Sequence, residues 1–417
     1  MKNLILLAIG ATLLSTSAFA SKARLEALGE DHFGSQYVDD NRNMFLNAAQ
    51  IHNHNDFLIF EAGDTGNTLD TASTPKASGG YFARNGGAIY GIYFGQDSNT
   101  AAGLRAAPIL GNIGGSAGQY TAAEAGVVTN AVENNNTLDI FYGRDGAMKW
   151  AARLSYSSSE IGQAQSDGTD QIYEDSSQSA MLLGLGAISG DWEYYINAGL
   201  NNEAEVNGIT PTSGGSFDFA VKGGLGLQIG AIKDLGDGAK GFVEVRQINI
   251  EETELDALDG EWSVQRINLG YGKAQKMNDT LTAFYRVEYF QETNENYAYV
   301  EDYEIKTSFV KATMGFEAMA TSWLTLRGSV ANNLISEEDV DGSSSGEDGK
   351  RTIDAVNVAL GATVKFGDFS IDGLITNDTD GDGALDEVAD TTTEENDKDG
   401  VLRTDSLMSR VSFTYNF

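Results

Sequence analysis

The chain of 417 residues contains no cysteine and only three prolines, and no apolar run beyond its first twenty residues is long enough to cross a bilayer as a helix. Without cysteine there can be no disulfides and no thiolate chemistry. Because a membrane-spanning helix needs about 20 mostly apolar residues, the sequence argues against a helical membrane protein. Basic residues are also scarce, with 27 Lys and Arg against 61 Asp and Glu. Since clustered basic residues bind a phosphate backbone, we expect no nucleic acid partner.

The residues that are abundant favour strands. The chain has 49 glycines and 17 tyrosines, and Pro75, Pro108 and Pro211 all fall in stretches expected to be loops, where no ladder hydrogen bond is lost. The formal charge of −34 comes mainly from acids in the hydrophilic stretches between apparent strands, so we expect those acids to face water. This composition indicates an all-β protein.

The carboxyl terminus gives the clearest pattern. Apolar residues at every second position, Val411, Phe413, Tyr415 and Phe417, alternate with polar ones, Arg410, Ser412, Thr414 and Asn416. Such alternation predicts a strand with one face in lipid and the other toward a polar lumen.

The amino terminus has the features of a secretory signal. Lys2 precedes an apolar run, and Ala18-Phe19-Ala20 matches the small-x-small cleavage pattern, so residues 1–20 are predicted to be removed. We expect residues 21–55 to form a periplasmic or plug-like segment and residues 56–417 to form a transmembrane β-barrel.

Short and long connections alternate along the chain. Val356 to Phe366 alternates, the tight turn Gly367-Asp368 follows, and after the next strand an acidic stretch from Asn377 to Gly400 precedes the last one. Other short turns are expected at residues 143–146, 189–191, 236–240, 276–279 and 320–322, and long polar loops at residues 157–177, 201–216, 251–261, 291–304 and 336–351. Transmembrane barrels combine short turns with long external loops in this way. The pattern predicts an antiparallel barrel of about 16 strands, with 14 as the alternative, short periplasmic turns and long acidic extracellular loops.

The four tryptophans fit this register. Trp150, Trp192 and Trp323 follow expected short turns, and Trp262 opens a strand after a long loop. Tryptophan collects where hydrocarbon meets the headgroups, so strand ends are the expected positions.

The alternating carboxyl-terminal strand that ends on Phe417 resembles the closing strand of Gram-negative outer-membrane proteins. The resemblance implies a location in the bacterial outer membrane after export through the inner membrane. It also implies that the assembly machinery of that membrane reads the last strand, and that outer-membrane lipid and lipopolysaccharide surround the barrel.

Two shorter stretches carry narrower resemblances. Ala27-Leu28-Gly29, followed by paired acids and Asn47-Ala48-Ala49, looks like the entry segment of the long-chain fatty acid transporter superfamily, although Ala48 stands where that family has proline. This start, together with the run from Leu138 to Gly143 and Lys149-Trp150, is similar to porin-like major outer-membrane proteins of predatory delta-proteobacterial relatives.

Alternation also predicts which charged residues line the lumen. The expected pore-lining residues are basic at Lys149, Arg153, Lys222, Arg266, Arg286, Lys311, Arg327, Lys365 and Arg410, and acidic at Asp139, Glu193, Asp218, Glu288, Glu317 and Asp372. Because buried charges are costly unless paired, this many imply a water-filled lumen or an interior lattice of ion pairs. Charges that only neutralise one another are one interpretation, and charge rings that select small solutes are the other.

Two further segments suggest specific roles. The Ala- and Gly-rich span from Gly103 to Asn135 could fold inward as a constriction or could be an ordinary surface loop. Acids at alternate positions followed by glycine predict a calcium loop, with Asp378, Asp380, Asp382 and Asp386 as ligands and simple solvation as the alternative. Asp339, Asp341, Glu347 and Asp348 could bind divalent cations that bridge to lipopolysaccharide phosphates.

Catalysis is not expected. The three histidines, His32, His52 and His54, precede the first expected strand, and a barrel enzyme needs a histidine at the rim to activate a nucleophile or water. We therefore expect a non-enzymatic porin without cofactor, apart from the calcium considered above, that lets small hydrophilic solutes diffuse. The alternatives are a hydrophobic-ligand transporter with an amino-terminal plug and a structural or adhesive surface barrel. Trimers are common among porins that resemble this chain, so a homotrimer is an open expectation.

Overall fold

A computed structural model describes most of the chain after residue 20. The described residues are 21–62, 77–95, 137–166, 171–209, 216–223, 226–252, 261–295, 303–342, 349–352, 356–377 and 407–417.

Strands dominate the described residues, and all of them belong to one sheet. In chain order they are β1 (Phe57–Ala62), β2 (Ala77–Asn85), β3 (Ala88–Phe94), β4 (Leu138–Arg144), β5 (Lys149–Ser166), β6 (Gln171–Ser189), β7 (Trp192–Ile209), β8 (Ser216–Gly223), β9 (Gly226–Gly236), β10 (Ala239–Glu252), β11 (Glu261–Lys276), β12 (Leu281–Glu295), β13 (Glu304–Met319), β14 (Leu324–Asp341), β15 (Gly349–Arg351), β16 (Val356–Phe366), β17 (Phe369–Asn377) and β18 (Leu407–Asn416).

The sheet closes on itself as an antiparallel barrel. The last strand, β18, pairs with the first, β1, with Phe57 opposite Asn416 and Ala62 opposite Val411. Strands β8 and β9 lie end to end between β7 and β10, and β15 and β16 lie end to end beside β14, so the labelled strands occupy 16 positions around the wall. The predicted barrel class and strand number are therefore confirmed.

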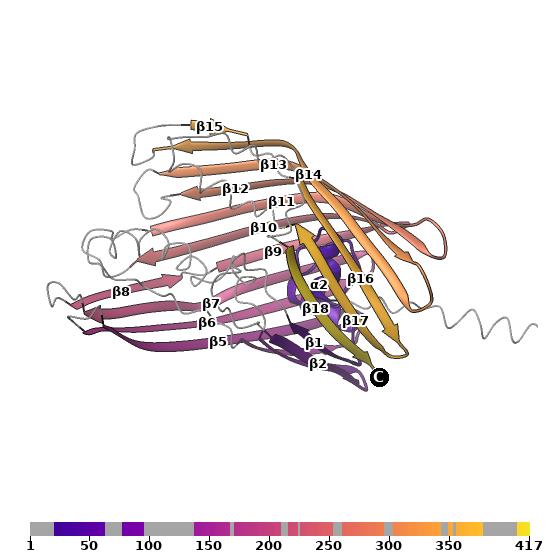
Figure 1. Cartoon of the computed structure of the whole chain (residues 1–417), viewed down its shortest axis with the longest axis horizontal. Coiled ribbons are helices and arrows are strands. Elements are labelled where there is room, and N and C mark those ends of the chain that lie inside the picture. Colours follow the sequence, from indigo (N-terminus) through magenta and orange to yellow (C-terminus); the bar gives the residue numbers. More distant parts are fainter. Residues whose placement is uncertain are drawn as a thin grey trace, which may run out of the picture.

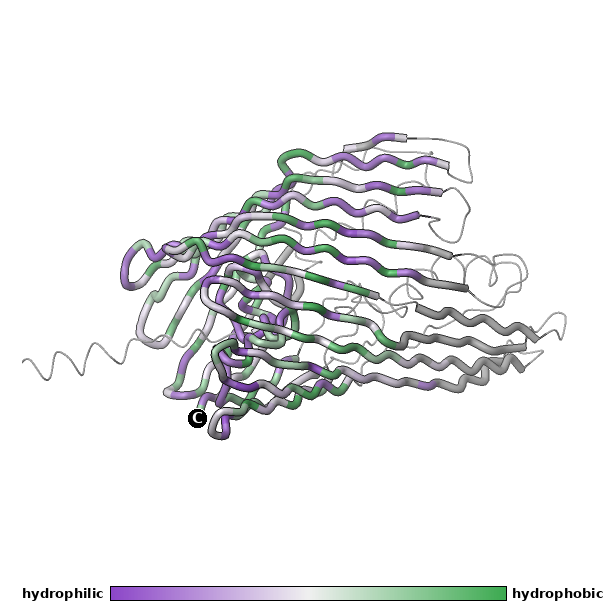
Figure 2. The backbone as a smooth tube through the Cα atoms, turned by 180° about the vertical axis from the view of Figure 1, so that it is seen from behind, coloured by the Kyte–Doolittle hydropathy of each residue, from purple (hydrophilic) through white to green (hydrophobic). Residues whose placement is uncertain are grey.

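The period of two in the sequence sets the two faces of the wall. In β18 the side chains of Val411, Phe413 and Tyr415 are exposed on the outside, whereas Ser412 and Thr414 are buried toward the lumen. Figure 2 shows the same alternation of hydrophilic and hydrophobic residues along the described strands. Because the outward face is apolar, the barrel can expose it to lipid.

The short connections gather at one end of the barrel, which we call the turn end. Every short turn expected from the sequence joins two strands there, and a further one joins β2 to β3. The chain also ends there, since the amide of Phe417 donates to the carbonyl of Asp56. The exposed indoles of Trp150, Trp192 and Trp323 lie at this end, as expected for an aromatic belt. Figure 1 shows these turns and the carboxyl terminus on its right-hand side.

The wall is much taller on one side than on the other. Strands β5, β6 and β7 have 18, 19 and 18 residues, whereas β1, β3 and β4 have 6, 7 and 7. About 9–11 tilted residues cross a bilayer, so the long strands project well beyond it, toward the left in Figure 1.

This height corrects three expected loops. Most of residues 157–177 belongs to β5 and β6, most of residues 201–216 belongs to β7, and most of residues 336–351 belongs to β14 and β15. These stretches have polar residues at consecutive positions, a pattern that is also typical of loops. Beyond the bilayer both faces of a strand meet water, so the ladder of backbone hydrogen bonds continues without an apolar side.

The amino-terminal part of the chain lies inside the barrel. Residues 21–55, which we call the lumenal segment, form α2 (Lys22–Ala27), α3 (Asn43–Leu46) and the 3-10 turn η1 (Ala48–His52). Figure 1 shows α2 enclosed by the wall, where it packs on β14, β16, β17 and β18, while η1 packs on β3, β4, β5 and β6. No helix within the described residues is long and apolar enough to cross a bilayer.

Local sequence explains the first helix. The Ser21 hydroxyl accepts a hydrogen bond from the amide of Arg24 at 3.0 Å, which satisfies a free donor at the helix start. The helix ends before Gly29, whose φ of +76° and close approach to Thr313 on the wall both favour glycine. Leu25 of α2 and Leu28, which follows the helix, are fully buried in an apolar cluster with Phe284 of the wall.

Candidate functional site

The candidate site is the barrel interior, where charged wall residues meet the lumenal segment. Arg24 on α2 donates to the Asp40 carboxylate at 2.8 Å, to Glu317 on β13 at 3.0 Å and to the carbonyl of Asp39 at 2.9 Å. Its guanidinium therefore joins two parts of the lumenal segment to the wall.

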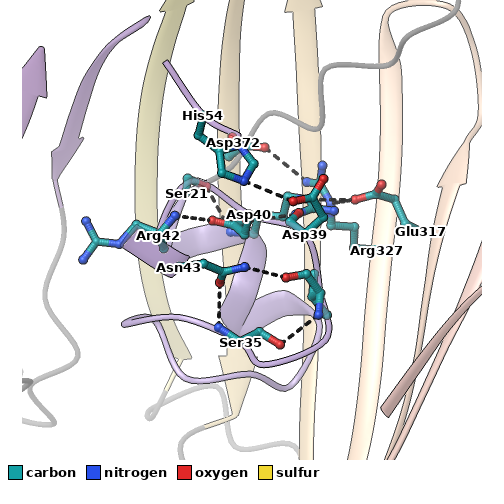
Figure 3. A network of polar contacts seen from close by, with 12 residues as sticks. Ser21, Ser35, Asp39, Asp40, Arg42, Asn43, His54, Glu317, Arg327 and Asp372 are labelled. Atoms are coloured by element: carbon teal, nitrogen blue, oxygen red, sulfur yellow. Dashed lines mark hydrogen bonds and ion pairs between the residues drawn. The ribbon is translucent and has the colours of Figure 1, made fainter. Parts of the chain in front are cut away.

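The network continues along the wall from Glu317. This carboxylate also accepts from Arg327 on β14 at 2.6 Å, and Arg327 donates to Asp372 on β17 at 3.1 Å. Figure 3 shows Glu317, Arg327 and Asp372 projecting from the wall toward the lumenal segment. The three side chains form a continuous chain of ion pairs across neighbouring strands.

A second network fixes the middle of the lumenal segment. Arg42 is buried and donates to Glu61 on β1 at 3.2 Å and to the hydroxyl of Tyr93 on β3 at 3.1 Å, while that hydroxyl donates to Glu61 at 2.5 Å. The Arg42 guanidinium also lies 4.1 Å from the centre of the Phe45 ring. Arginine at this position is therefore held by charge, hydrogen bonds and a cation–π contact together.

Three more wall arginines contact the lumenal segment. Arg286 on β12 donates to Glu30 at 2.8 Å, and Arg410 on β18 donates to Glu26 at 2.5 Å. Arg153 on β5 donates to the carbonyl of Phe45 at 3.0 Å. These residues come from different sides of the barrel, so the lumenal segment is held around its circumference.

At the turn end, contacts with η1 complete the attachment. Gln50 donates to Glu193 on β7 at 2.5 Å, and Glu193 also accepts from Lys240 on β10 at 3.0 Å. A ring nitrogen of His52 lies 2.9 Å from the carbonyl oxygen of Trp150.

Apolar contacts reinforce the side of the lumen formed by β1 to β5. Met44, Phe45, Ala48 and Ile51 of the lumenal segment belong to one buried cluster with the wall residues Phe57, Ile59, Phe82, Ile89, Tyr93, Phe141 and Ala151. The lumenal segment is thus attached on this side by apolar packing together with the Arg42 network, and on the side of β12 to β18 by ion pairs together with smaller apolar clusters around Phe284 and Leu374.

Inward-facing glycines make room for the lumenal segment. A Cβ atom on Gly186 would lie 2.0 Å from the Asn47 side chain and 2.5 Å from the Ala49 amide, and one on Gly272 would lie 2.2 Å from the Tyr37 ring. A Cβ atom on Gly143 would lie 2.7 Å from Ile51 of η1, and one on Gly361 would lie 2.6 Å from Ala27 of α2. Any larger residue at these places would displace the lumenal segment, so wall and segment fit each other closely.

Burial also affects the titration of two acids in the lumenal segment. Burial raises the pKa of Glu26 to about 7 against the opposing charge of Arg410, and it raises the pKa of Asp40 to about 6 against that of Arg24. Both carboxyl groups therefore exchange protons near neutral pH.

The predicted pore-lining residues divide into three groups. Those that contact the lumenal segment or its ion-pair chain directly are Lys149, Arg153, Glu193, Arg286, Glu317, Arg327, Asp372 and Arg410. Those that pair with another wall residue are Asp139 with Arg153, Glu288 with Arg286, and Arg266, whose partner is Glu292. The third group is Lys311 and Lys365, which are half-buried at inward register positions, and Asp218 and Lys222, which lie in β8, where only the backbone is described.

Sequence reasoning missed several charged residues of the site. Glu244 and Arg246 on β10 alternate with the outward-facing Val243 and Val245, so the same pattern could have identified them. Glu61 lies in β1 after four apolar residues, Phe57 to Phe60, so the pattern before it does not show which way its side chain points. The partners of these wall residues in the lumenal segment could not be predicted, because no strand periodicity applies to that segment. They are Arg24, Glu26, Glu30, Asp40 and Arg42.

The remaining expectations concern metals and loops. Several predicted features lie outside the described residues. They are the calcium residues Asp378, Asp380, Asp382 and Asp386, the span 103–135 and the three prolines. Within the part of the chain that is described, no group of three or more histidines and acids could hold a metal ion. The three histidines pair with different acids. His32 lies near Glu26 and Asp31, His52 near Asp145, and His54 near Asp39.

The chain is similar to several solved structures. No protein-family model and no curated protein matches the chain. Among solved structures, CdiB from Acinetobacter baumannii has a TM-score of 0.46 at 11% identity, with 87% of this chain and 59% of that chain covered. The toluene transporter TodX from Pseudomonas putida has a TM-score of 0.36 at 11% identity, with 90% and 94% covered. A FadL homologue from Pseudomonas aeruginosa has a TM-score of 0.38 at 12% identity, with 95% and 98% covered.

The chain spans little more than half the length of the first of these structures. The chain is similar to each of the three structures over 87–95% of its own length.

Proposed function

We propose that this protein is an outer-membrane channel for small hydrophilic solutes whose lumen is obstructed by residues 21–55, which then act as a plug. The apolar outer face and the aromatic turn end support the membrane location, and the predicted signal sequence and terminal strand supply the export and assembly signals. We infer no catalytic role.

The single observation that carries the proposal is that the lumenal segment is attached on opposite sides of the barrel. Arg286 and Arg410 bind it from β12 and β18, while Arg153 binds it from β5. A segment held in this way reduces the free cross-section, so solute passage depends on how firmly it is docked.

The charged lumen favours hydrophilic solutes. Most predicted pore-lining charges are paired, so the wall is polar but carries little free charge. Uncharged or weakly charged solutes would meet no strong electrostatic barrier at the height of the plug.

Conductance in planar bilayers tests the proposal. The full mature chain should give rare or small steps, and a variant lacking residues 21–55 should give large ohmic steps of the kind that a 16-strand barrel permits. If the deletion variant conducts no better than the full chain, the lumenal segment is not what limits passage. If the deletion variant does not fold, Arg24→Met, which should weaken docking of the lumenal segment, provides the same test, and it should also give more frequent conductance steps.

A hydrophobic-ligand transporter is the second candidate. It is favoured by the apolar cluster that joins Phe45 to Phe82 and Phe141, and by the inward-facing rings of Phe290 and Phe309, which stack with centroids 4.5 Å apart. Saturable binding of a fluorescent fatty acid, lost when Phe290 and Phe309 are replaced by Ser, would favour this candidate. Solute conductance without such binding would favour the channel.

A structural or adhesive role would use the tall wall. Lys350 on this wall pairs with Glu337 at 2.7 Å and with Asp339 at 2.9 Å, both well exposed. We also propose weak calcium binding by the acidic stretch predicted from sequence. Calcium titration should differ between the wild type and a triple Asn variant at Asp378, Asp380 and Asp382.

A further inference from the structure

Ser21, the residue that follows the predicted cleavage site, is completely buried inside the barrel. Its hydroxyl caps α2, and the next amide, that of Lys22, donates to Glu61 on β1 at 2.8 Å. The backbone nitrogen of Ser21 is therefore one residue away from a carboxylate that is itself buried.

A second buried carboxylate faces the same residue. Asp372 on β17 is fully buried, and its Oδ1 atom accepts hydrogen bonds from Arg327 at 3.1 Å and from Thr363. Its Oδ2 atom is also buried and has no hydrogen-bond partner among the described residues. The Ser21 side chain lies against this carboxylate. An unsatisfied buried carboxylate oxygen is costly, so a donor is expected to lie close to it.

Removal of the signal sequence would create such a donor. A leader peptidase adds one water molecule across the Ala20–Ser21 peptide bond. Ala20 leaves as a carboxylate on the released peptide, and Ser21 keeps an amine that takes up the remaining proton. The product is an ammonium group with three N–H donors.

We propose that the α-ammonium group of Ser21, formed by cleavage after Ala20, binds between Asp372 and Glu61 and locks the plug in the lumen. The precursor cannot make this contact, because its Ser21 nitrogen is an uncharged amide with a single donor. Cleavage therefore does more than release the chain from the export machinery, since it completes the attachment of the plug. The inference rests on the proposed plugging of the lumen.

Two carboxylates provide a suitable environment for an ammonium group. A buried cation is tolerated only where it is paired and hydrogen-bonded. Asp372 offers a free oxygen, and Glu61 accepts from the neighbouring amide, from Arg42 and from the Ser412 hydroxyl, which orients it toward the start of α2.

Amine-selective labelling of the folded mature protein at pH 7 tests the inference. In the wild type the α-amine should react at least tenfold more slowly than in the denatured chain. Asp372→Asn should restore most of that rate, and the matched control Asp368→Asn, at an exposed position in the turn before the same strand, should leave it unchanged. Mature protein refolded after acetylation of the α-amine is a second test, since it removes the charge without altering a side chain.

Protease digestion of residues 21–55 in the same samples separates the two proposals. Rapid cleavage of this segment in the folded wild type would mean that the lumen is not plugged at all. If residues 21–55 resist digestion but the α-amine of Ser21 is still labelled freely, only the proposed binding of the ammonium group to Asp372 and Glu61 is overturned. Protection that is equal in acetylated and unmodified protein would also overturn it, whereas several-fold faster digestion after acetylation is the expected result.

Discussion

Replacing Arg24 by Met should loosen the plug without opening the barrel wall. The Arg24 side chain is only 4% exposed and is the sole ion-pair partner found for Asp40 among the described residues. Asp40 is completely buried, so its charge is not solvated in the docked plug. Removing one partner of a buried ion pair costs about 3–5 kcal/mol. Glu317 contributes less to this cost because it keeps Arg327 at 2.6 Å.

This cost can be converted into a population of undocked plug. With about 1.4 kcal/mol for each factor of ten, the undocked fraction should rise roughly 10²- to 4 × 10³-fold. Single-channel recordings should show correspondingly more frequent openings, and protease should cut residues 21–55 faster. The closed wall does not depend on Arg24, so the folded barrel should keep its resistance to unfolding in detergent.

Lys276→Met is the matched control. Lys276 is the last residue of β11, at the turn end of the barrel, and is 69% exposed, with its partner Asp279 at 3.4 Å almost fully exposed. Exposed pairs of this kind contribute about 0–1 kcal/mol, so this variant should behave as the wild type does. Arg24→Met recordings and digestion rates that match those of Lys276→Met would refute the idea that ion pairs hold the plug.

Three further predictions use other parts of the interior and the last strand. Gly186→Val should displace the plug and raise conductance, because the new Cβ would overlap the lumenal segment. Gly373→Ala is the control, since a Cβ atom there would have open space around it, and it should leave conductance unchanged. Equal conductance in the two variants would contradict this prediction. Because Glu26 holds its proton more tightly in the docked plug, docking should weaken as pH rises from about 4.5 to about 7. Glu26→Gln should reduce this pH dependence, which the digestion rates of residues 21–55 at pH 5 and pH 8 would measure. An unchanged pH dependence in the variant would count against the prediction. Deleting Phe417 should lower the amount of assembled barrel in the outer membrane, as the resemblance of the last strand implies. Phe366→Ala, which alters another exposed aromatic residue, should not lower this amount. Equal amounts of assembled barrel from both variants would remove the special role of the terminus.

The sequence alone determined the wall of this protein. Side chains of a strand alternate with a period of two, so the directions of Phe413 and Ser412 follow from local order, and the turn at Gly367-Asp368 needs no distant partner. Closure followed as well, because an apolar strand at the end of the chain needs a partner that leaves no open edge.

Only the tertiary structure decided how the lumen is filled and how tall the wall is. Arg410 was expected to face inward, but its partner Glu26 is 384 residues away in the chain and lies in a segment with no strand periodicity. The extension of β5 and β6 beyond the bilayer was also hidden, since polar residues on both faces are typical of loops and of strands in water alike. Alternation reports which way a side chain points, whereas the partner it meets depends on long-range packing that no local pattern encodes.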